Sequence, residues 1–367
     1  MQTNNGIVLM TVNQMASTLA NAYANLLKAN VSLRKFPSVM LWGAPGVGKS
    51  QGVRQVAEIL GEKSGKKVVV TDVRLLLFNP VDLRGIPTAN AEKTLAVWLK
   101  PKIFQMDDSN DVVNILFLDE ISAAPQSVQA AAYQITLDHT VGEHKLPENC
   151  IVIAAGNRVT DRSVAFNMPK ALANRLCHIE IENHQKSWHD WAVKANIHEN
   201  VLGFLDANPE FLMDFQPEED GLAFPTPRSW EMVSNILNYA GSSLKESFPI
   251  VVGCVGERAA YALLEWDKVY DRVPEAKDVY DGKEKGLPTR PEALYALSAK
   301  LVSYANNVLT EKQVDNAIEY IAKMQVEFRS RVFRDFLRVK RLVPFLKKND
   351  LYKSWFDKMD LDWEDYE

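Results

Sequence analysis

The segment Gly43-Ala-Pro-Gly-Val-Gly-Lys-Ser50 constrains this 367-residue chain more than any other feature. It follows a short apolar run, Ser38–Trp42, and it precedes apolar residues at helical spacing, Val53, Val56 and Leu60. The segment matches the pattern G-x-x-x-x-G-K-[ST] in full, and a strand before it with a helix after it is the context that the pattern needs. Glycines let successive backbone N–H groups point inward, and a helix N-terminus adds positive charge. The segment therefore predicts a loop that binds phosphate groups.

Further apolar runs predict the sheet around this loop. Because these runs are continuous rather than alternating, they favour strands that are buried on both faces. Strands that alternate with helices are typical of a parallel sheet. The predicted strands after the first are Val68–Thr71, Asn114–Leu118, Cys150–Ala155 and His178–Ile181. The fold class that we predict is an α/β P-loop core, a parallel sheet flanked by helices, followed by an all-α domain.

The sequence changes character near residue 185, because no β-branched strand run follows that point. Helical patterns cover Trp188–Leu205, Arg228–Tyr239, 250–266 and Glu292–Leu342, and the proline-rich, charged residues 267–292 predict a loop. We therefore expect four parts: an N-terminal helical segment (1–36), the α/β domain (37–185), a helical domain (186–346) and an acidic tail (347–367).

Composition excludes several classes of protein. The chain is 47% apolar and 24% charged, which excludes a disordered or fibrous protein. Its net charge of −5 makes it a poor default nucleic-acid binder. The three cysteines, Cys150, Cys177 and Cys254, form no disulfide framework and favour a reducing compartment. Since there is no uninterrupted apolar run of about 18 residues and no basic N-terminal segment, we expect a cytoplasmic protein without a membrane span.

Polar side chains follow two of the predicted strands. Asp119 and Glu120 end the run Ile115–Leu118, and Asn157 follows the strand that ends near Ala155. The Asp119 carboxylate would hold Mg²⁺, directly or through water. The Glu120 carboxylate would orient or deprotonate an attacking water. The Asn157 side chain would touch the terminal phosphate or hold that water.

The order of these motifs resembles an AAA+ ATPase over residues of about 37–240. The helical remainder suits the lid domain of that family. Within the family, several stretches resemble the MoxR-type branch: Asp72–Leu75, Asn79–Pro87, Val141–Pro147 and the segment from Asn157 to Arg162.

The resemblance implies a role for each matching residue. Asn157 matches sensor 1, Arg228 matches sensor 2, and Arg175 occupies the place of the arginine finger, which acts on nucleotide bound by the neighbouring protomer. Arg158 and Arg162 are rival fingers. Glu120, Asn157 and Arg175 would be catalytic, and Ser50 and Asp119 would hold Mg²⁺. ATP would be bound by Gly43, Ala44, Pro45, Gly46, Val47, Gly48, Lys49, Ser50, Gln51, Asp119 and Arg228.

The resemblance also implies an assembly and a task. A helix–loop insertion at Phe78–Trp98 and a hairpin at Asp138–Pro147 would project toward the pore of a homo-oligomeric ring, expected to be a hexamer. Such a ring hydrolyses ATP with Mg²⁺ and remodels or matures a client protein, like a chaperone, together with a separate VWA-domain protein. Alternatives are the motor subunit of a metal chelatase, a nucleic-acid-dependent motor, and an ATP-binding assembly switch with little turnover.

Two C-terminal features stay open at this stage. Residues Arg329–Lys348 contain eight basic residues and one acid, Asp335, which predicts a packed helix with a solvated basic face or, as the alternative, an interaction surface. The tail has six acids within Phe356–Glu367, so it is either disordered or a short docking peptide that carries Trp363 and Tyr366. The histidines show no zinc pattern, and Trp188 and Trp191 are expected in a helix core.

Overall fold

The computed structural model describes residues 3–4, 6–158, 168, 170–216, 221–240, 243–284, 286–308, 310–359 and 361–366. The chain divides into two compact units, Met1–His184 and Gln185–Glu367. The first residues of the chain belong to the first unit, where they supply two strands and a helix. The tail belongs to the second unit, where it forms helices.

The described part of the first unit contains a seven-stranded sheet. Its order is β1 (Thr3–Asn4), β2 (Ile7–Met10), β11 (Cys177–Ile181), β3 (Val39–Trp42), β10 (Cys150–Gly156), β7 (Val112–Asp119) and β4 (Lys67–Arg74). β1 pairs antiparallel with β2, and every other neighbouring pair is parallel. The predicted parallel α/β sheet and its five predicted strands are confirmed. The sequence analysis missed β2, which pairs with β11 at the register Val8 to Ile179.

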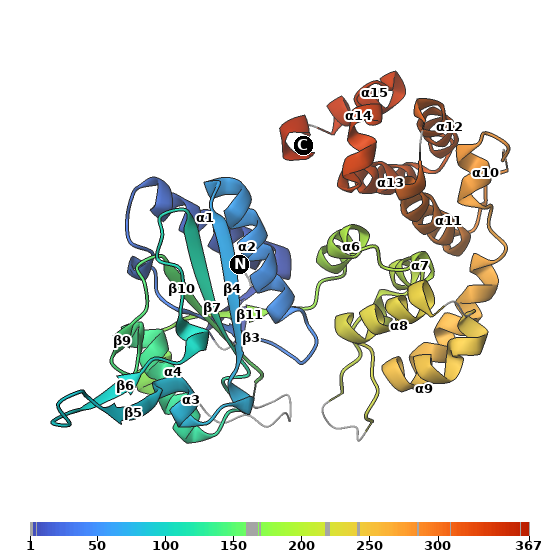
Figure 1. The fold of residues 1–367 in the computed structure, drawn as a ribbon. Helices are drawn as coiled ribbons and strands as arrows, with labels where there is room; N and C mark the ends of the chain where they lie inside the picture. The colour runs from blue at the N-terminus through green and yellow to red at the C-terminus, as the bar shows by residue number, and fades with distance from the viewer. Residues whose placement is uncertain are drawn as a thin grey trace. The chain divides into compact units, whose positions relative to one another are not determined.

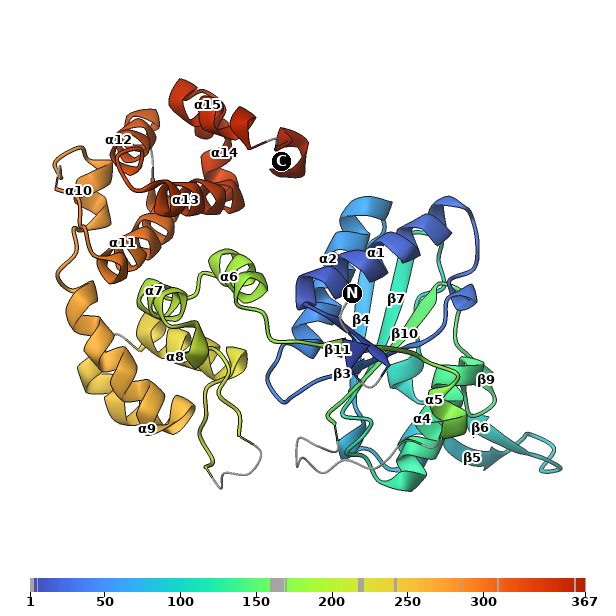
Figure 2. The same cartoon turned by 180° about the vertical axis from the view of Figure 1, so that it is seen from behind.

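Helices cover both faces of this sheet (Figures 1 and 2). α1 (Val12–Lys28) and α2 (Lys49–Ser64) pack on one face, where Met15, Leu19 and Val53 are fully or almost fully buried. α4 (Gln126–Asp138) and the short α3 (Pro80–Arg84) cover the other face. The remaining short helices of this unit are η1 (Leu33–Lys35), η2 (Leu75–Leu77), η3 (Lys102–Phe104) and α5 (Lys170–Ala173).

Two details differ from the sequence-based expectations, which were that the strands are buried on both faces and that the insertion consists of a helix and a loop. β4 lies at the edge of the sheet, so its residues are mostly half-buried or exposed rather than buried on both faces. The insertion contains α3 and then a two-stranded antiparallel hairpin, β5 (Ile86–Ala89) and β6 (Ala96–Leu99), which extends away from the sheet in Figure 1. The predicted hairpin at 138–147 is confirmed as β8 (Thr140–Val141) and β9 (His144–Lys145).

The described part of the second unit is helical. Its helices are α6 (Gln185–Lys194), α7 (Glu199–Ala207), η5 (Pro209–Phe211), α8 (Pro227–Tyr239), α9 (Leu244–Tyr270), α10 (Ala276–Tyr280), α11 (Pro291–Tyr304), η6 (Ala305–Asn307), α12 (Glu311–Ile321), α13 (Val326–Arg338), η7 (Lys340–Leu342), α14 (Val343–Leu346), α15 (Asp350–Lys358) and η8 (Trp363–Tyr366). The single helix expected at Trp188–Leu205 is two helices, because the chain turns at Asn196, whose φ is +53°. The loop expected at 267–292 contains the end of α9 and all of α10.

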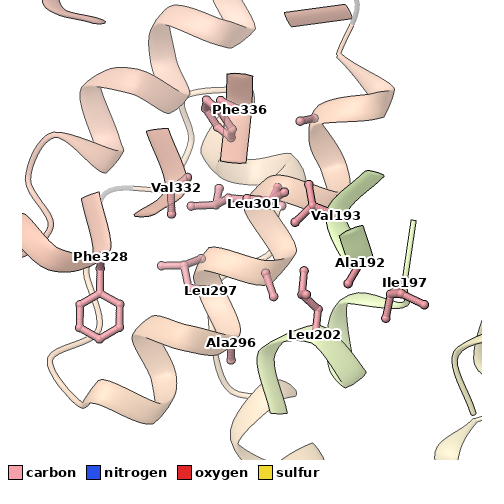
Figure 3. Packing of buried hydrophobic residues seen from close by; sticks show 14 of the residues in the cluster. Ala192, Val193, Ile197, Leu202, Ala296, Leu297, Leu301, Phe328, Val332 and Phe336 are labelled. Atoms are coloured by element: carbon pink, nitrogen blue, oxygen red, sulfur yellow. The ribbon is translucent and has the colours of Figure 1, made fainter. Parts of the chain in front are cut away.

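One apolar core joins these helices. Figure 3 shows α11 side chains, among them Leu297 and Leu301, between residues of α6 and α7 and residues of α13. Trp188 is buried in this core and Trp191 packs against it, as predicted. α9 is the one described helix that is long and apolar enough to cross a membrane, a test that core helices also meet.

The basic segment is internally paired. Arg331 contacts Asp206, and Arg338 contacts both Asp190 and Asp335. Arg329 and Arg341 donate hydrogen bonds to the backbone carbonyls of Ala322 and Asn306. The segment is thus a packed helix, α13, followed by the short helices η7 and α14, as the favoured interpretation expected, but Arg331 and Arg338 are ion-paired rather than part of a solvated basic face.

The tail packs against the same unit. Asn349 caps α15 by accepting from the Tyr352 N–H at 2.9 Å. The Trp363 ring stacks on Phe356 with centroids 3.8 Å apart, and the Lys347 ammonium lies over Trp363. The aromatic residues of the described tail therefore contribute to the core of the second unit, which differs from a disordered tail.

Candidate nucleotide-binding site

The glycine-rich segment forms a loop between β3 and α2. Gly48 is the N-cap of α2, and its φ of +106° lies in the left-handed region that disfavours residues with a side chain. No side chain caps α2, so its first-turn N–H groups are left for another acceptor. A helix N-terminus of this kind, preceded by a curled glycine loop, attracts phosphate oxygens.

The Lys49 ammonium lies inside this loop. It donates hydrogen bonds to the carbonyl oxygens of Gly43 at 2.7 Å and Ala44 at 3.1 Å, and to Oδ1 of Asn157 at 2.8 Å. The residue is only 9% exposed. An ammonium inside a glycine loop that precedes a helix N-terminus is placed to bind the oxygens of an anionic ligand.

Ser50 and Asp119 meet at the C-terminal edge of the sheet. The Ser50 hydroxyl donates to Oδ2 of Asp119 at 2.9 Å, and the Glu120 N–H donates to Oδ1 of Asp119 at 2.8 Å. Next to β7, the β4 strand carries Asp72. Burial raises the pKa of Asp72, and the nearby carboxylate of Asp119 raises it further, whereas Arg74 and Arg54 act in the opposite direction. This edge therefore concentrates carboxylate oxygens, the ligands that Mg²⁺ prefers.

Glu120 has an unusual backbone. Its φ of +58° lies in the left-handed region, which is uncommon for a residue with a side chain. No described residue contributes a hydrogen bond or an ion pair to its carboxylate. Strained backbone and an unengaged carboxylate beside a phosphate loop fit a group that acts on a reacting water. The motif itself does not reveal this backbone conformation.

Asn157 is fixed from a second side by Ser122, which the sequence analysis did not select. The Asn157 N–H donates to the Ser122 hydroxyl at 3.0 Å, and the Ile121 N–H donates to the Ala155 carbonyl at 3.0 Å. Ser122 is 5% exposed. The two contacts join the segment after β7 to the end of β10, so they set where the Asn157 side chain lies. In the sequence, Ser122 lies three residues after Asp119, and this position is the signal that could have identified it.

The three candidate finger arginines differ in their surroundings. Arg158 pairs with Glu180 of β11, at 2.5 Å, within its own chain. Arg175 lies between α5 and β11, is exposed, and has no described ion-pair partner. Arg162 lies outside the described residues. Of the two that are described, Arg158 is thus engaged with Glu180, whereas Arg175 is exposed; the choice between them as a finger stays a prediction.

Arg228 lies on the first turn of α8 in the second unit and is exposed. Thr226 begins this helix as its N-cap, accepting from the Ser229 N–H at 3.0 Å. The expected contact of Arg228 with nucleotide stays a prediction.

The residues of the first unit fit a Mg²⁺–nucleotide. The loop supplies backbone donors, Lys49 supplies a cation, and Ser50 with Asp119 supplies two oxygen ligands at hydrogen-bond distance from each other. Within the described residues, no cluster of three or more His, Cys, Asp or Glu side chains suggests another metal centre.

One comparison with known proteins, the match to a family model, agrees with this site. Residues 38–178 match the model of the family described as "ATPase family associated with various cellular activities (AAA)". A search of curated proteins gave no match. Solved structures similar in part include NtrX from Brucella abortus, 13% identical with a TM-score of 0.38, which covers 91% of this chain and 69% of that one. A RuvB variant from Thermotoga maritima is 14% identical with a TM-score of 0.34, covering 83% of this chain and 85% of that one.

The two structural likenesses are too weak to carry an argument, whereas the family match spans the elements that form the site. It begins at β3, includes the phosphate loop, Asp119, Glu120, Asn157 and Arg175, and ends within β11. The part of the first unit that holds the phosphate loop, Asp119, Glu120 and Asn157 is therefore similar to the AAA family of ATPases.

Proposed function

We propose that this chain hydrolyses ATP with Mg²⁺ in a homo-oligomeric AAA+ ring. The observation that carries the proposal is the meeting of three sequence motifs at one edge of the sheet. Lys49 of the loop contacts Asn157 after β10, and Ser50 contacts Asp119 at the end of β7. These residues are 108 and 69 positions apart in the sequence. A glycine-rich turn without a ligand would need none of these contacts.

Each residue has a definite task in this proposal. The loop from Gly43 to Gln51 binds the phosphates through backbone N–H groups, and Lys49 balances their charge. Ser50 and Asp119 would hold Mg²⁺, which neutralises charge on the phosphates when it is bound. Glu120 orients and deprotonates the attacking water, and Asn157 fixes the position of that water.

Two variants test the assignment. Lys49→Ala is expected to abolish ATP binding, because the buried cation is lost. Glu120→Gln keeps the shape of the side chain but removes the base, so ATP binding should persist while turnover falls by at least about 100-fold. Binding is measured with a fluorescent ATP analogue and turnover by phosphate release. Normal turnover by Glu120→Gln would rule out the assigned base.

The exposure of Arg175 supports a site completed by a neighbour. In the proposed ring, which we expect to be a hexamer, Arg175 of one protomer stabilises charge on the phosphoryl group bound by the next. Arginine fingers in other NTPases contribute about 10³–10⁵ in rate. Arg228 of the second unit would sense the nucleotide and move with it. Chain mass in solution, measured with and without ATP, tests the assembly.

We further propose that the ring belongs to the MoxR-type branch and works in the cytoplasm on a client protein, together with a separate VWA-domain protein. The insertion supports contact with a client, because it exposes apolar side chains: Val81 is 52%, Ile86 61% and Leu95 66% exposed. Such apolar patches commonly mark interaction sites. Purified VWA-domain protein should change the turnover rate if the proposal holds. The pairing of Arg331 and Arg338 within the chain weakens the nucleic-acid alternative, and DNA should leave turnover unchanged.

A further inference from the structure

His178 of β11 lies between two elements of the site. Its Nδ1 accepts a hydrogen bond from the Trp42 indole N–H at 2.9 Å. Its Nε2 lies 2.7 Å from the carbonyl oxygen of Ala173. The Trp42 and His178 rings are also stacked, with centroids 6.1 Å apart and planes inclined by 16°. The sequence analysis found no zinc pattern among the histidines and assigned this one no role.

The two partners determine which ring nitrogen carries the proton. An indole N–H can only donate, so Nδ1 of His178 must be the acceptor. A carbonyl oxygen can only accept, so Nε2 must donate. The ring is therefore held in one tautomer and one orientation, and a side chain with no donor or no acceptor cannot make both contacts.

These contacts connect the phosphate loop with the segment that carries Arg175. Trp42 is the last residue of β3 and directly precedes Gly43 of the loop. Ala173 is the last residue of α5, and its carbonyl also accepts from the Leu176 N–H at 3.2 Å. That bond closes a turn of four residues in which Arg175 is the third. His178 thus contacts both the Ala173 carbonyl, with which the turn containing Arg175 begins, and Trp42, which precedes the phosphate loop.

The backbone between the two ends is rigid. β11 pairs with β3 over four residues, with His178 opposite Met40 and Glu180 opposite Trp42. The Cys177 N–H donates to the Ser38 carbonyl at 2.9 Å. Among the described residues, the His178 ring is a direct polar connection between the Trp42 side chain and the turn that carries Arg175.

We propose that His178 is a positioning residue that couples the phosphate loop of a protomer to its own Arg175, and so to the nucleotide of the neighbouring protomer. The inference rests on the proposed role of Arg175 in trans. Nucleotide binding at one loop would then alter how well the next site hydrolyses ATP, through Trp42, His178 and the Ala173 turn.

The first test replaces the ring in the full-length chain. His178→Phe keeps an aromatic ring against Trp42 but loses both hydrogen bonds, so kcat should fall by about 10- to 100-fold, as expected when a catalytic group is misplaced by about 1 Å. The Kd for ATP should stay unchanged, since His178 does not contact the loop interior. His178→Gln offers an amide acceptor and donor and should recover part of the rate. Trp42→Phe removes one hydrogen bond and should act in the same direction with a smaller effect.

A mixing experiment separates positioning from general damage. Glu120→Gln chains are expected to bind ATP without turning it over, and they carry an intact Arg175 turn. Added to His178→Phe chains, they should raise turnover, because they supply a well-placed finger to active sites next to them. The matched control is a Glu120→Gln chain that also carries Arg175→Ala, which should give no rescue. In chains with Arg175→Ala, His178→Phe should lower kcat no further.

Each outcome decides between the alternatives. The proposal fails if His178→Phe turns over ATP at the wild-type rate. It also fails if Arg175→Ala chains are rescued by mixing while His178→Phe chains are not, or if His178→Phe weakens ATP binding as much as it lowers kcat. If His178→Phe does not fold and Trp42→Phe does, the same measurements of kcat, ATP binding and rescue by mixing are made with Trp42→Phe. Absence of turnover in the wild-type chain, or normal turnover in Arg175→Ala, would instead contradict the proposed function.

Discussion

The buried histidine of the second unit gives the strongest prediction about stability. His189 on α6 lies between two buried carboxylates, with Nδ1 2.9 Å from Asp206 and Nε2 2.9 Å from Asp335. Burial lowers the pKa of His189, but Asp335 and Asp206 outweigh it and raise the pKa to about 9. The imidazolium therefore joins α6, α7 and α13 by charge-assisted hydrogen bonds.

Charge balance explains why the proton is held. The surrounding groups are the carboxylates of Asp206, Asp335 and Asp190 and the guanidinium groups of Arg331 and Arg338. Gln185 adds a neutral hydrogen bond to Asp206 at 2.8 Å. Three negative charges face two permanent positive charges, so the cluster is neutral only when His189 carries its proton.

The sign and size of the effect follow from linkage. The pKa of His189 is raised in the folded chain above its ordinary value of 6.5. The stabilisation is then fully present below pH 6.5 and is lost as the pH rises through about 9. The difference between these two pKa values corresponds to about 3 kcal/mol of unfolding free energy.

The assay is urea unfolding of the intact chain between pH 6 and pH 9.5, followed by tryptophan fluorescence. Most tryptophans lie in the second unit: Trp188, Trp191, Trp230, Trp266, Trp355 and Trp363. A histidine NMR titration of the same chain reads the pKa directly, and Asp335→Asn, which keeps the shape but removes one carboxylate, should lower it. A second-unit stability that is flat from pH 6.5 to 9, or a His189 that titrates near 6.5, would refute the reasoning.

Three further predictions follow from single contacts. Ser122→Ala removes the acceptor of the Asn157 N–H and should lower kcat by about tenfold with little change in ATP affinity; an unchanged kcat would show that Asn157 is positioned without it. Gly156→Ala would place a Cβ 2.7 Å from the Ser122 Oγ and 2.9 Å from the Met40 Cε, so it should cost about 1–3 kcal/mol in thermal or urea unfolding of the first unit. Trp363→Ala removes the stack on Phe356 and should expose the C-terminal segment to limited proteolysis while ATP turnover stays normal; equal protease resistance would contradict the packing of the tail.

Strong local signals made the sheet and the loop predictable. The strands at 114–118 and 150–155 are apolar runs in interior strands of the sheet, and their buried environment tolerates few other residues. The loop pattern is specific because phosphate binding needs glycines, a lysine and a hydroxyl at fixed spacing. β2 was missed because four residues near a polar N-terminus carry little periodicity, and pairing with β11 is what defines it as a strand.

Contacts between distant residues were not predictable. Ser122 and His178 look like ordinary core or surface residues, and their importance depends on Asn157 and Trp42, which only the fold brings near them. The break at Asn196 also depends on tertiary packing, since the apolar spacing continues across it. The basic segment 329–348 looked like a charged surface because its acidic partners, Asp206 and Asp190, lie more than 100 residues away in the sequence.

Turnover of Mg²⁺–ATP per chain, measured over a wide range of protein concentration, tests the central claim most directly. If Arg175 of a neighbour completes each site, specific activity rises cooperatively with concentration in the wild-type chain and stays low in Arg175→Ala and Glu120→Gln. Mass measurement at the lowest concentration should then show smaller species. Full specific activity in a chain shown to be monomeric at that concentration would contradict a site shared between protomers.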